Sequence, residues 1–279
     1  MEPLVSDQPQ QKLESLSNKL GFDIPVEAVP LPSRGVLYPP EHPLHNAETV
    51  EIKCMTAKEE DILTSSALLK KGTVFDALMQ SCFINKSIDP STLLPGDRNA
   101  ILVAIRITGY GPEHTVKITC PECEDVFEHT FNMTSLKIKR MGVAPDHENT
   151  NLFSYTLPLS KLVVKFKLLN GKDIDDMNEY SEKRKKLGMA SDSNVTSRLF
   201  FSVVEIKFPE DGHNEKDRGK ISQIVSNLRA GDARALRLYM DKVAPDLDKK
   251  SEVRCSKCSK VSEVDVPMGL NFFWPDIAV

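Results

Sequence analysis

The chain has 279 residues, 40% of them hydrophobic and 27% charged, so it is long enough to bury two modest cores. Its formal net charge of −4 gives no attraction to nucleic acid, and no apolar run approaches the ~18 residues of a membrane span. The N-terminus lacks the basic and apolar stretches of a secretory signal. The two CxxC pairs and the two remaining cysteines, Cys54 and Cys82, fit a reducing cytosol better than an oxidising compartment.

The N-terminal residues 1–46 are predicted to form an extended, proline-rich arm. Residues 25–43 contain too many prolines for regular structure, and turns are expected around Arg34 and Tyr38. Arg34 at a turn tip could project towards a partner, or the segment could be a purely structural strap.

A first module is predicted over residues 47–145. A strand at 49–54 precedes Thr56, which caps a helix with Glu59 three residues later in a capping box. That helix is expected to end at Lys70, Lys71 and Gly72, and a second helix to cover 74–83. A third helix is expected to start at Asp97 as its N-cap and to deliver the chain to a β-hairpin.

A second module is predicted over residues 146–279. Strands are expected at 152–157 and 162–169, followed by a helix with acidic residues at its start and the basic run 183–186 at its end. The basic run could contact nucleic acid, but a solvated helix end is the simpler interpretation. Further helices are expected at 194–205 and 219–229, then a helix capped by Asp232 and a second hairpin.

Two CxxC pairs carry the clearest chemistry. Cys120 and Cys123 lie between two strand-like runs, and so do Cys255 and Cys258, as in a zinc knuckle. Each knuckle offers two thiolates, so the sequence predicts one structural Zn²⁺ per chain, shared between the modules. A redox disulfide is the weaker alternative, since neither pair opens a helix after a βαβ strand.

Two histidines flank the first knuckle and are the remaining candidates for metal ligands. His114 or His129 could replace a cysteine, although lone histidines on short strands are more often surface residues. A catalytic zinc lacks the HExxH or HxE…PCxxC spacing. Neither GxxxxGK[ST], GxGxxG nor GxSxG occurs, so no enzyme activity and no small-molecule substrate are predicted, with a metal-dependent hydrolase as a minor alternative.

The two halves also resemble each other. Asp97 precedes Cys120 by the same number of residues as Asp232 precedes Cys255, and each aspartate follows a glycine. Upstream, VEIKCMTAKEEDIL at Val50 is echoed by VKFKLLNGKDIDDM at residue 164. We therefore predict an α+β fold of two duplicated modules, each with a strand, helices and a knuckle hairpin, joined at one zinc-ribbon-like site and related by a pseudo-twofold axis.

Several motifs together resemble a known family. These are LPSRGVLYP at 31–39, TAKEEDIL at 56–63, LPGDRNAILVAIRITGYG at 94–111, CPEC, GDARAL, CSKC and a closing FFWP. In combination they resemble the T4-like bacteriophage baseplate hub assembly protein family over about residues 25–275. The resemblance implies a late protein without catalytic activity, working in the host cytoplasm during tail assembly or in the virion tail baseplate.

Two classes of function therefore remain. The first is an assembly factor or structural component of the baseplate hub that contacts other tail hub or baseplate proteins, with no membrane partner. Its candidate contact residues are Arg34 and Tyr38 in the proline-rich segment and Phe272, Phe273 and Trp274 near the C-terminus. Burial of the large aromatic side chains against a partner would stabilise the complex, but the same aromatics could equally fold back over the chain's own zinc hairpin. The alternative is a zinc-ribbon nucleic-acid-binding or transcription accessory protein, which the acidic pI of about 5.9 argues against.

Overall fold

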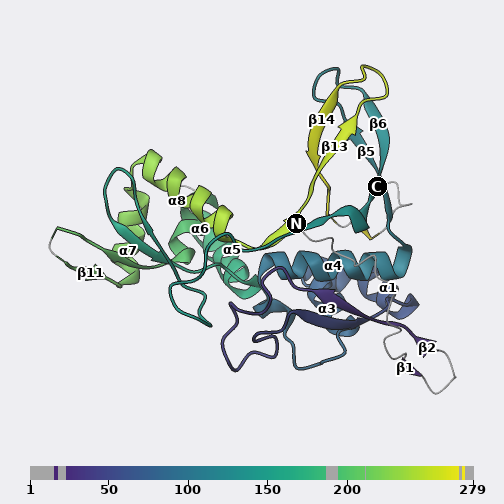
Figure 1. Ribbon diagram of the computed structural model, residues 1–279, viewed down its shortest axis with the longest axis horizontal. Coiled ribbons are helices and arrows are strands. Elements are labelled where there is room, and N and C mark those ends of the chain that lie inside the picture. Colours follow the sequence, from purple (N-terminus) through teal and green to yellow (C-terminus); the bar gives the residue numbers. More distant parts are fainter. Residues whose placement is uncertain (1–15, 18–22, 187–193, 211, 270–271, 274–279) are drawn as a thin grey trace.

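The chain forms two bodies of helices and strands, from which two β-hairpins project together (Figure 1). The computed structural model describes residues 16–17, 23–186, 194–210, 212–269 and 272–273. Within these ranges the structure is a mixture of helices and small antiparallel sheets, as predicted for the fold class. Among the described residues, no helix is both long and apolar enough to cross a lipid bilayer.

The first body precedes the first hairpin. A short pair of strands lies at its edge, and its elements are β1 (Leu16–Ser17), β2 (Asp23–Ile24), β3 (Val26–Pro30), β4 (Thr49–Lys53), α1 (Ala57–Thr64), α2 (Ser66–Lys71), α3 (Val74–Cys82), η1 (Pro90–Thr92) and α4 (Pro95–Tyr110). Strands β3 and β4 pair antiparallel, so the end of the proline-rich arm belongs to a two-stranded sheet.

One helix of the first body was predicted wrongly. The prediction of one continuous helix from Thr56 to Gly72 fails at Ser65, where the backbone is extended and separates α1 from α2. The hydroxyl of Thr64 donates to the carbonyls of Glu60 and Asp61 at 3.2 Å, and such local bonds compete with helix propagation. The capping box of Thr56 and the left-handed end at Gly72 are both present.

The role predicted for Asp97 was also wrong. Leu94 is the N-cap of α4 and Pro95 is its first residue, so Asp97 lies within the first turn. Its carboxylate is completely buried, accepting hydrogen bonds from the Ser33 N–H at 2.9 Å, the Ser33 hydroxyl at 2.6 Å and the Tyr38 hydroxyl at 2.7 Å. Asp97 therefore anchors the loop after β3 to the start of α4.

The second body lies between the two hairpins in sequence. Its sheet has the strand order β11-β10-β9-β8 and is antiparallel throughout. The elements are β8 (Phe153–Thr156), β9 (Val163–Phe166), α5 (Gly171–Lys186), α6 (Asn194–Ser202), β10 (Val203–Lys207), β11 (Asn214–Glu215), α7 (Arg218–Ser226) and α8 (Ala230–Val243).

Two predictions for the second body needed correction. Residues 203–205 were assigned to a helix but begin β10, because Val203 and Ile206 are buried in the sheet and β-branched residues favour a strand. Asp232 is not the N-cap of α8, which is Arg229; its buried carboxylate accepts from the N–H groups of Leu159 at 2.8 Å and Ser160 at 3.0 Å.

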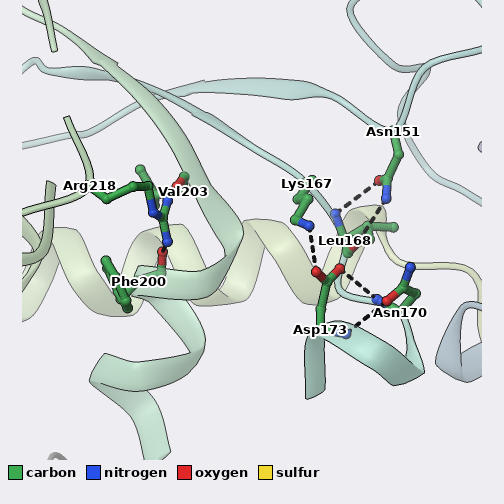
Figure 2. Close-up of polar contacts among 8 residues, drawn as sticks. All are labelled: Asn151, Lys167, Leu168, Asn170, Asp173, Phe200, Val203 and Arg218. Carbon is green, nitrogen blue, oxygen red and sulfur yellow. Dashed lines mark hydrogen bonds and ion pairs between the residues drawn. The ribbon is translucent and has the colours of Figure 1, made fainter. Parts of the chain in front are cut away.

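A lysine–carboxylate pair marks the first turn of a helix in each body. In the second body, Lys167 Nζ lies 2.6 Å from Asp173 Oδ1, and the Asn170 N–H donates to Asp173 Oδ2 at 3.2 Å (Figure 2). In the first body, Lys53 Nζ lies 2.6 Å from Glu59 Oε1, and the Thr56 N–H donates to Glu59 Oε2 at 3.0 Å. The chain spacing between the three residues is identical in both places.

The hairpins are β5 (Glu113–Thr119) with β6 (Val126–Asn132), and β13 (Lys250–Arg254) with β14 (Val261–Asp265). Helix α4 leads directly into β5, as predicted. Helix α8 does not lead directly into the second hairpin, because β12 (Asp246–Asp248) intervenes and pairs with β7 (Lys137–Lys139), which follows the first hairpin and η2 (Met133–Ser135). This β7–β12 pair joins a segment of the first half to a segment of the second half.

Candidate metal centre

The two CxxC turns have the same backbone conformation. The N–H of Cys120 donates to the Asp125 carbonyl at 2.9 Å, and that of Cys255 donates to the Lys260 carbonyl at 2.9 Å. The residue after the second cysteine of each pair has a positive φ, 57° at both Glu124 and Ser259. Each hairpin therefore presents its two thiols in the same way.

All four sulfurs meet where the hairpin tips come together. The Sγ atoms lie within 4.8 Å of one another, with 3.7 Å between Cys120 and Cys258 and 3.7 Å between Cys123 and Cys255. A tetrahedral zinc with Zn–S bonds of ~2.3 Å would separate its sulfurs by about 3.8 Å. A disulfide would need ~2.05 Å. The donor set thus fits one thiophilic metal ion shared equally between the hairpins.

Charged residues at the tips join the two turns around the sulfurs. Lys257 lies 3.1 Å from Asp125, and Lys260 lies 3.3 Å from Glu122, so each ion pair links one turn to the other. These ion pairs are largely exposed, so they contribute little to the stability of the fold and serve mainly to orient one CxxC turn against the other. Cys120 and Cys255 are buried while Cys258 is exposed, so the site is open to solvent on one side.

Proton affinity at the site suits a cationic occupant. Backbone N–H groups of Cys123 and Glu122 lower the pKa of Cys120 to about 7. At Cys123, a backbone hydrogen bond from Asp125 lowers the pKa, but burial and the adjoining sulfurs outweigh it and raise the pKa to about 12. Because metal ligation requires deprotonated cysteines, metal binding would release protons at this site.

The two histidines near the first knuckle lie outside the sulfur cluster. In the part of the chain that the structure describes, the group able to hold a metal consists of the four cysteines. His114 is buried at the far end of β5, with its ring edge-to-face against Phe272 at 5.1 Å, and His129 packs against Phe131.

The candidate contact residues differ in exposure. Arg34 is exposed at a turn with φ of 52°, whereas Tyr38 is buried and bonded to Asp97. Phe272 and Phe273 are each 1% exposed and pack on the first body, so in this structure they belong to the core, and their contact with a partner stays a prediction. Trp274 lies outside the described residues.

Sequence reasoning missed one buried residue that joins these regions. Arg106 is 1% exposed and donates to the carbonyl of Phe272 at 2.8 Å. It lies among apolar residues of a helix, and nothing in its local sequence distinguishes it from a solvated arginine.

Comparison with known proteins gave a match to a protein family. A family model described as T4 bacteriophage base plate protein matches residues 38–274, most of the chain. No curated protein and no solved structure matched in the corresponding searches. The family match confirms the resemblance indicated by the motifs.

Proposed function

The chain belongs to the T4 bacteriophage base plate protein family, and we propose that it is a non-enzymatic assembly factor or structural component of the baseplate hub. Membership supports a structural role in a phage baseplate. The finer assignment to the hub rests in addition on the motif resemblance and on the architecture, in which two paired hairpins project from two bodies (Figure 1). Such a protein would act by contact with other hub or baseplate proteins, in the host cytoplasm during assembly or in the finished tail.

The metal is proposed to be one structural Zn²⁺ per chain, held by Cys120, Cys123, Cys255 and Cys258. The observation that carries this proposal is the pair of reciprocal 3.7 Å sulfur contacts between hairpins that are far apart in sequence. A bound zinc would supply no chemistry beyond holding the tips together, since all four ligand positions are filled by thiolates.

The two modules are proposed to be duplicates, with an arm over 1–46 and modules over 47–145 and 146–279. Support comes from contacts that recur at matching positions: the lysine–carboxylate pairs, the Gly-Asp helix starts and the two CxxC turns. The likeness extends upstream of residue 47, since the loop after β3 is anchored by Asp97 as the loop after β8 is anchored by Asp232. The second half departs from the duplicated pattern in the intervening β12 and in the strands β10 and β11, which enlarge its sheet.

The proposed function is tested with a phage that lacks the gene and is complemented by variants. We expect Cys258→Ser to abolish hub assembly, seen as missing baseplates by electron microscopy, while the control Cys54→Ser supports normal tails. Normal baseplates with Cys258→Ser would contradict a role for the metal site. Salt-sensitive binding to nucleic acid, with no hub protein co-purifying, would favour the nucleic-acid alternative instead.

The exposed turn at Arg34 is a second proposed contact with hub proteins. Arg34→Ala is expected to weaken capture of hub proteins from infected cells while the chain stays folded at the temperature of the assay. Tyr38→Phe is a matched variant in the same loop, and it should weaken capture less because the side chain is buried. Equal capture by wild type and Arg34→Ala would remove this turn from the interface.

A further inference from the structure

Each hairpin is a two-stranded ribbon with one end at the metal site and the other at the bodies. A ribbon of two strands is marginally stable on its own, so its direction depends on what holds its ends. From His114 to Cys120 the strand extends about 20 Å, at ~3.3 Å per residue. A small change of angle at the base would therefore displace the sulfurs by several ångströms.

At the base, Arg106 joins three separate segments. Its guanidinium donates to the carbonyls of Phe272 at 2.8 Å, Gly111 at 2.9 Å and Glu113 at 3.0 Å. Gly111 ends α4, Glu113 begins the first ribbon, and Phe272 follows the second ribbon. One buried side chain thus fixes the start of the first ribbon relative to the segment that leaves the second.

Aromatic packing completes the same contact. The ring of Phe272 lies edge-to-face on His114 at 5.1 Å, and Phe273 lies 5.6 Å from Phe75 of α3. Both phenylalanines are almost fully buried, although they come from the part of the chain that follows the second hairpin. The ribbon bases also border one small cavity of about 90 Å³, lined by Phe131 of β6 and Ser251 of β13 among others.

We propose that Arg106, His114 and Phe272 form a base latch that positions the second ribbon against the first and so brings the four thiols together before a metal binds. These are positioning residues, since none of them touches the sulfurs. The proposal rests on the metal site of the proposed function. It adds that metal affinity depends on contacts about 20 Å from the metal, because a preorganised site loses less conformational freedom on binding.

The test is a Co²⁺ and Zn²⁺ titration of the full-length chain, with a competing chelator and the thiolate-to-cobalt absorption as readout. We expect Phe272→Ala to keep the four-thiolate spectrum and one-to-one stoichiometry but to bind of the order of 10- to 100-fold more weakly, the range seen when groups that orient metal ligands are removed. Phe272→Leu, which keeps most of the apolar volume that Phe272→Ala removes, should recover most of the affinity. Arg106→Lys should fall between the two.

The control is Phe166→Ala, which removes an equally buried ring from the second body. It should lower the melting temperature but leave metal affinity unchanged, which separates positioning from general destabilisation. Equal affinities of wild type and a folded Phe272→Ala would overturn the base latch.

A second measurement tests the latch even if wild type binds no metal and the proposed zinc site fails. Metal-free chains are treated briefly with diamide, which accepts two electrons and two protons as two thiols form a disulfide, and the products are mapped by mass spectrometry. With the latch intact, cross-hairpin disulfides of Cys120 with Cys258 and Cys123 with Cys255 should dominate. Phe272→Ala should shift pairing towards disulfides within each hairpin, and an unchanged pattern would overturn the proposal.

Discussion

The Gly-Asp helix starts of the two bodies share a sequence and a position but differ in how deeply they are enclosed. Asp97 is covered by the long loop between β3 and β4, and burial raises its pKa despite hydrogen bonds from Ser33 and Tyr38. At Asp232 burial also raises the pKa, but hydrogen bonds from Leu159 and Ser160 outweigh burial, so the pKa of Asp232 is lowered. The same local motif thus serves as an interior anchor in one half and as a support for a short surface turn in the other.

The glycines before these aspartates show the same difference. A Cβ atom at Gly96 would lie 2.1 Å from the Pro245 carbonyl oxygen and 2.7 Å from the Asp246 Cα, so backbone from the second half fills that space. At Gly231 the nearest atom would be the Cδ1 of Leu159 at 2.9 Å, at the end of a side chain that is 52% exposed. Enclosure in the first half comes from the second half folding onto it.

The largest expected effect concerns the hairpins, where the two halves should behave alike. Cys120→Ser and Cys255→Ser should lower the melting temperature strongly and equally, because each removes one of four ligands from a single site. Loss of a structural zinc can cost ~10 kcal/mol. Differential scanning calorimetry with and without chelator, together with metal analysis, should give one zinc per wild-type chain.

The buried Cys82 in the first body offers the control for that experiment, since Cys82→Ala should not change metal content. A stoichiometry of two, or unequal losses between Cys120→Ser and Cys255→Ser, would contradict a shared site.

Substitution of the two glycines by alanine is expected to destabilise the first half more than the second. Gly96→Ala is expected to destabilise the fold by about 1–3 kcal/mol or more, since backbone must move to admit the methyl group. Gly231→Ala should cost less than about 1 kcal/mol, because Leu159 can turn aside and alanine favours a helix. Urea unfolding measures the free energy of unfolding of both variants. Similar losses would show that the backbone at Pro245 moves as easily as the side chain of Leu159.

For the two aspartates, the larger loss of stability is expected in the second half, at Asp232. Asp232→Asn places an amide N–H₂ against a backbone N–H of Leu159 or Ser160, leaving a partly buried donor without an acceptor at a cost of about 1–3 kcal/mol. Asp97→Asn should cost less at pH 7, because the hydroxyls of Ser33 and Tyr38 can reorient and a buried charge is removed.

The pH dependence of those variants has a definite sign. Asp97, with its raised pKa, contributes stability below pH ~4 that is lost as pH rises through its folded pKa, whereas Asp232 contributes stability above pH ~4 that is lost as pH falls. Unfolding free energies from pH 3 to pH 7 should therefore change with opposite sign for the two asparagine variants relative to wild type. The same sign for both would mean that the two carboxylates have equivalent surroundings.

The smallest expected effect lies at the ribbon bases. His114 of the first ribbon corresponds to Lys249, the residue just before the second ribbon, and Lys249 Nζ lies 3.3 Å from Asp246 Oδ2. Burial and the nearby Arg106 lower the pKa of His114, so its native state favours the neutral imidazole. Its contribution to stability is present above pH ~6.5 and declines as pH falls below that value. His114→Gln should flatten the stability profile between pH 5 and pH 7, measured by urea unfolding.

The parts of this fold that sequence could predict are those set by neighbouring residues. The CxxC turns, the capping box at Thr56 and the helix from Val74 depend on spacing within a few positions, and the structure has all three. The meeting of the four cysteines was also predictable, because each pair offers only half of a closed zinc site.

The errors arose where a distant segment decides the outcome. Asp97 was assigned as a cap because Gly-Asp before a helix often is one, but Pro95 starts the helix earlier and Ser33 supplies the partner. Residues 203–205 follow a helical pattern on their own and become a strand because β9 is available to pair with them. The contact of Arg106 with Phe272 spans 166 residues, and no local pattern could indicate it.

The division of the four sulfurs between two hairpins also sets an order of events during protein synthesis. Cys120 and Cys258 are 138 residues apart, and the whole second body lies between them. A ribosome-bound chain therefore exposes two thiols for the time needed to make that body, about 7 to 28 s at 5–20 residues per second. During that interval the first knuckle can hold a metal only loosely or by borrowing ligands from another molecule. Tight closure becomes possible only once the second knuckle emerges, so a bound metal would mark chains whose two halves have both been made.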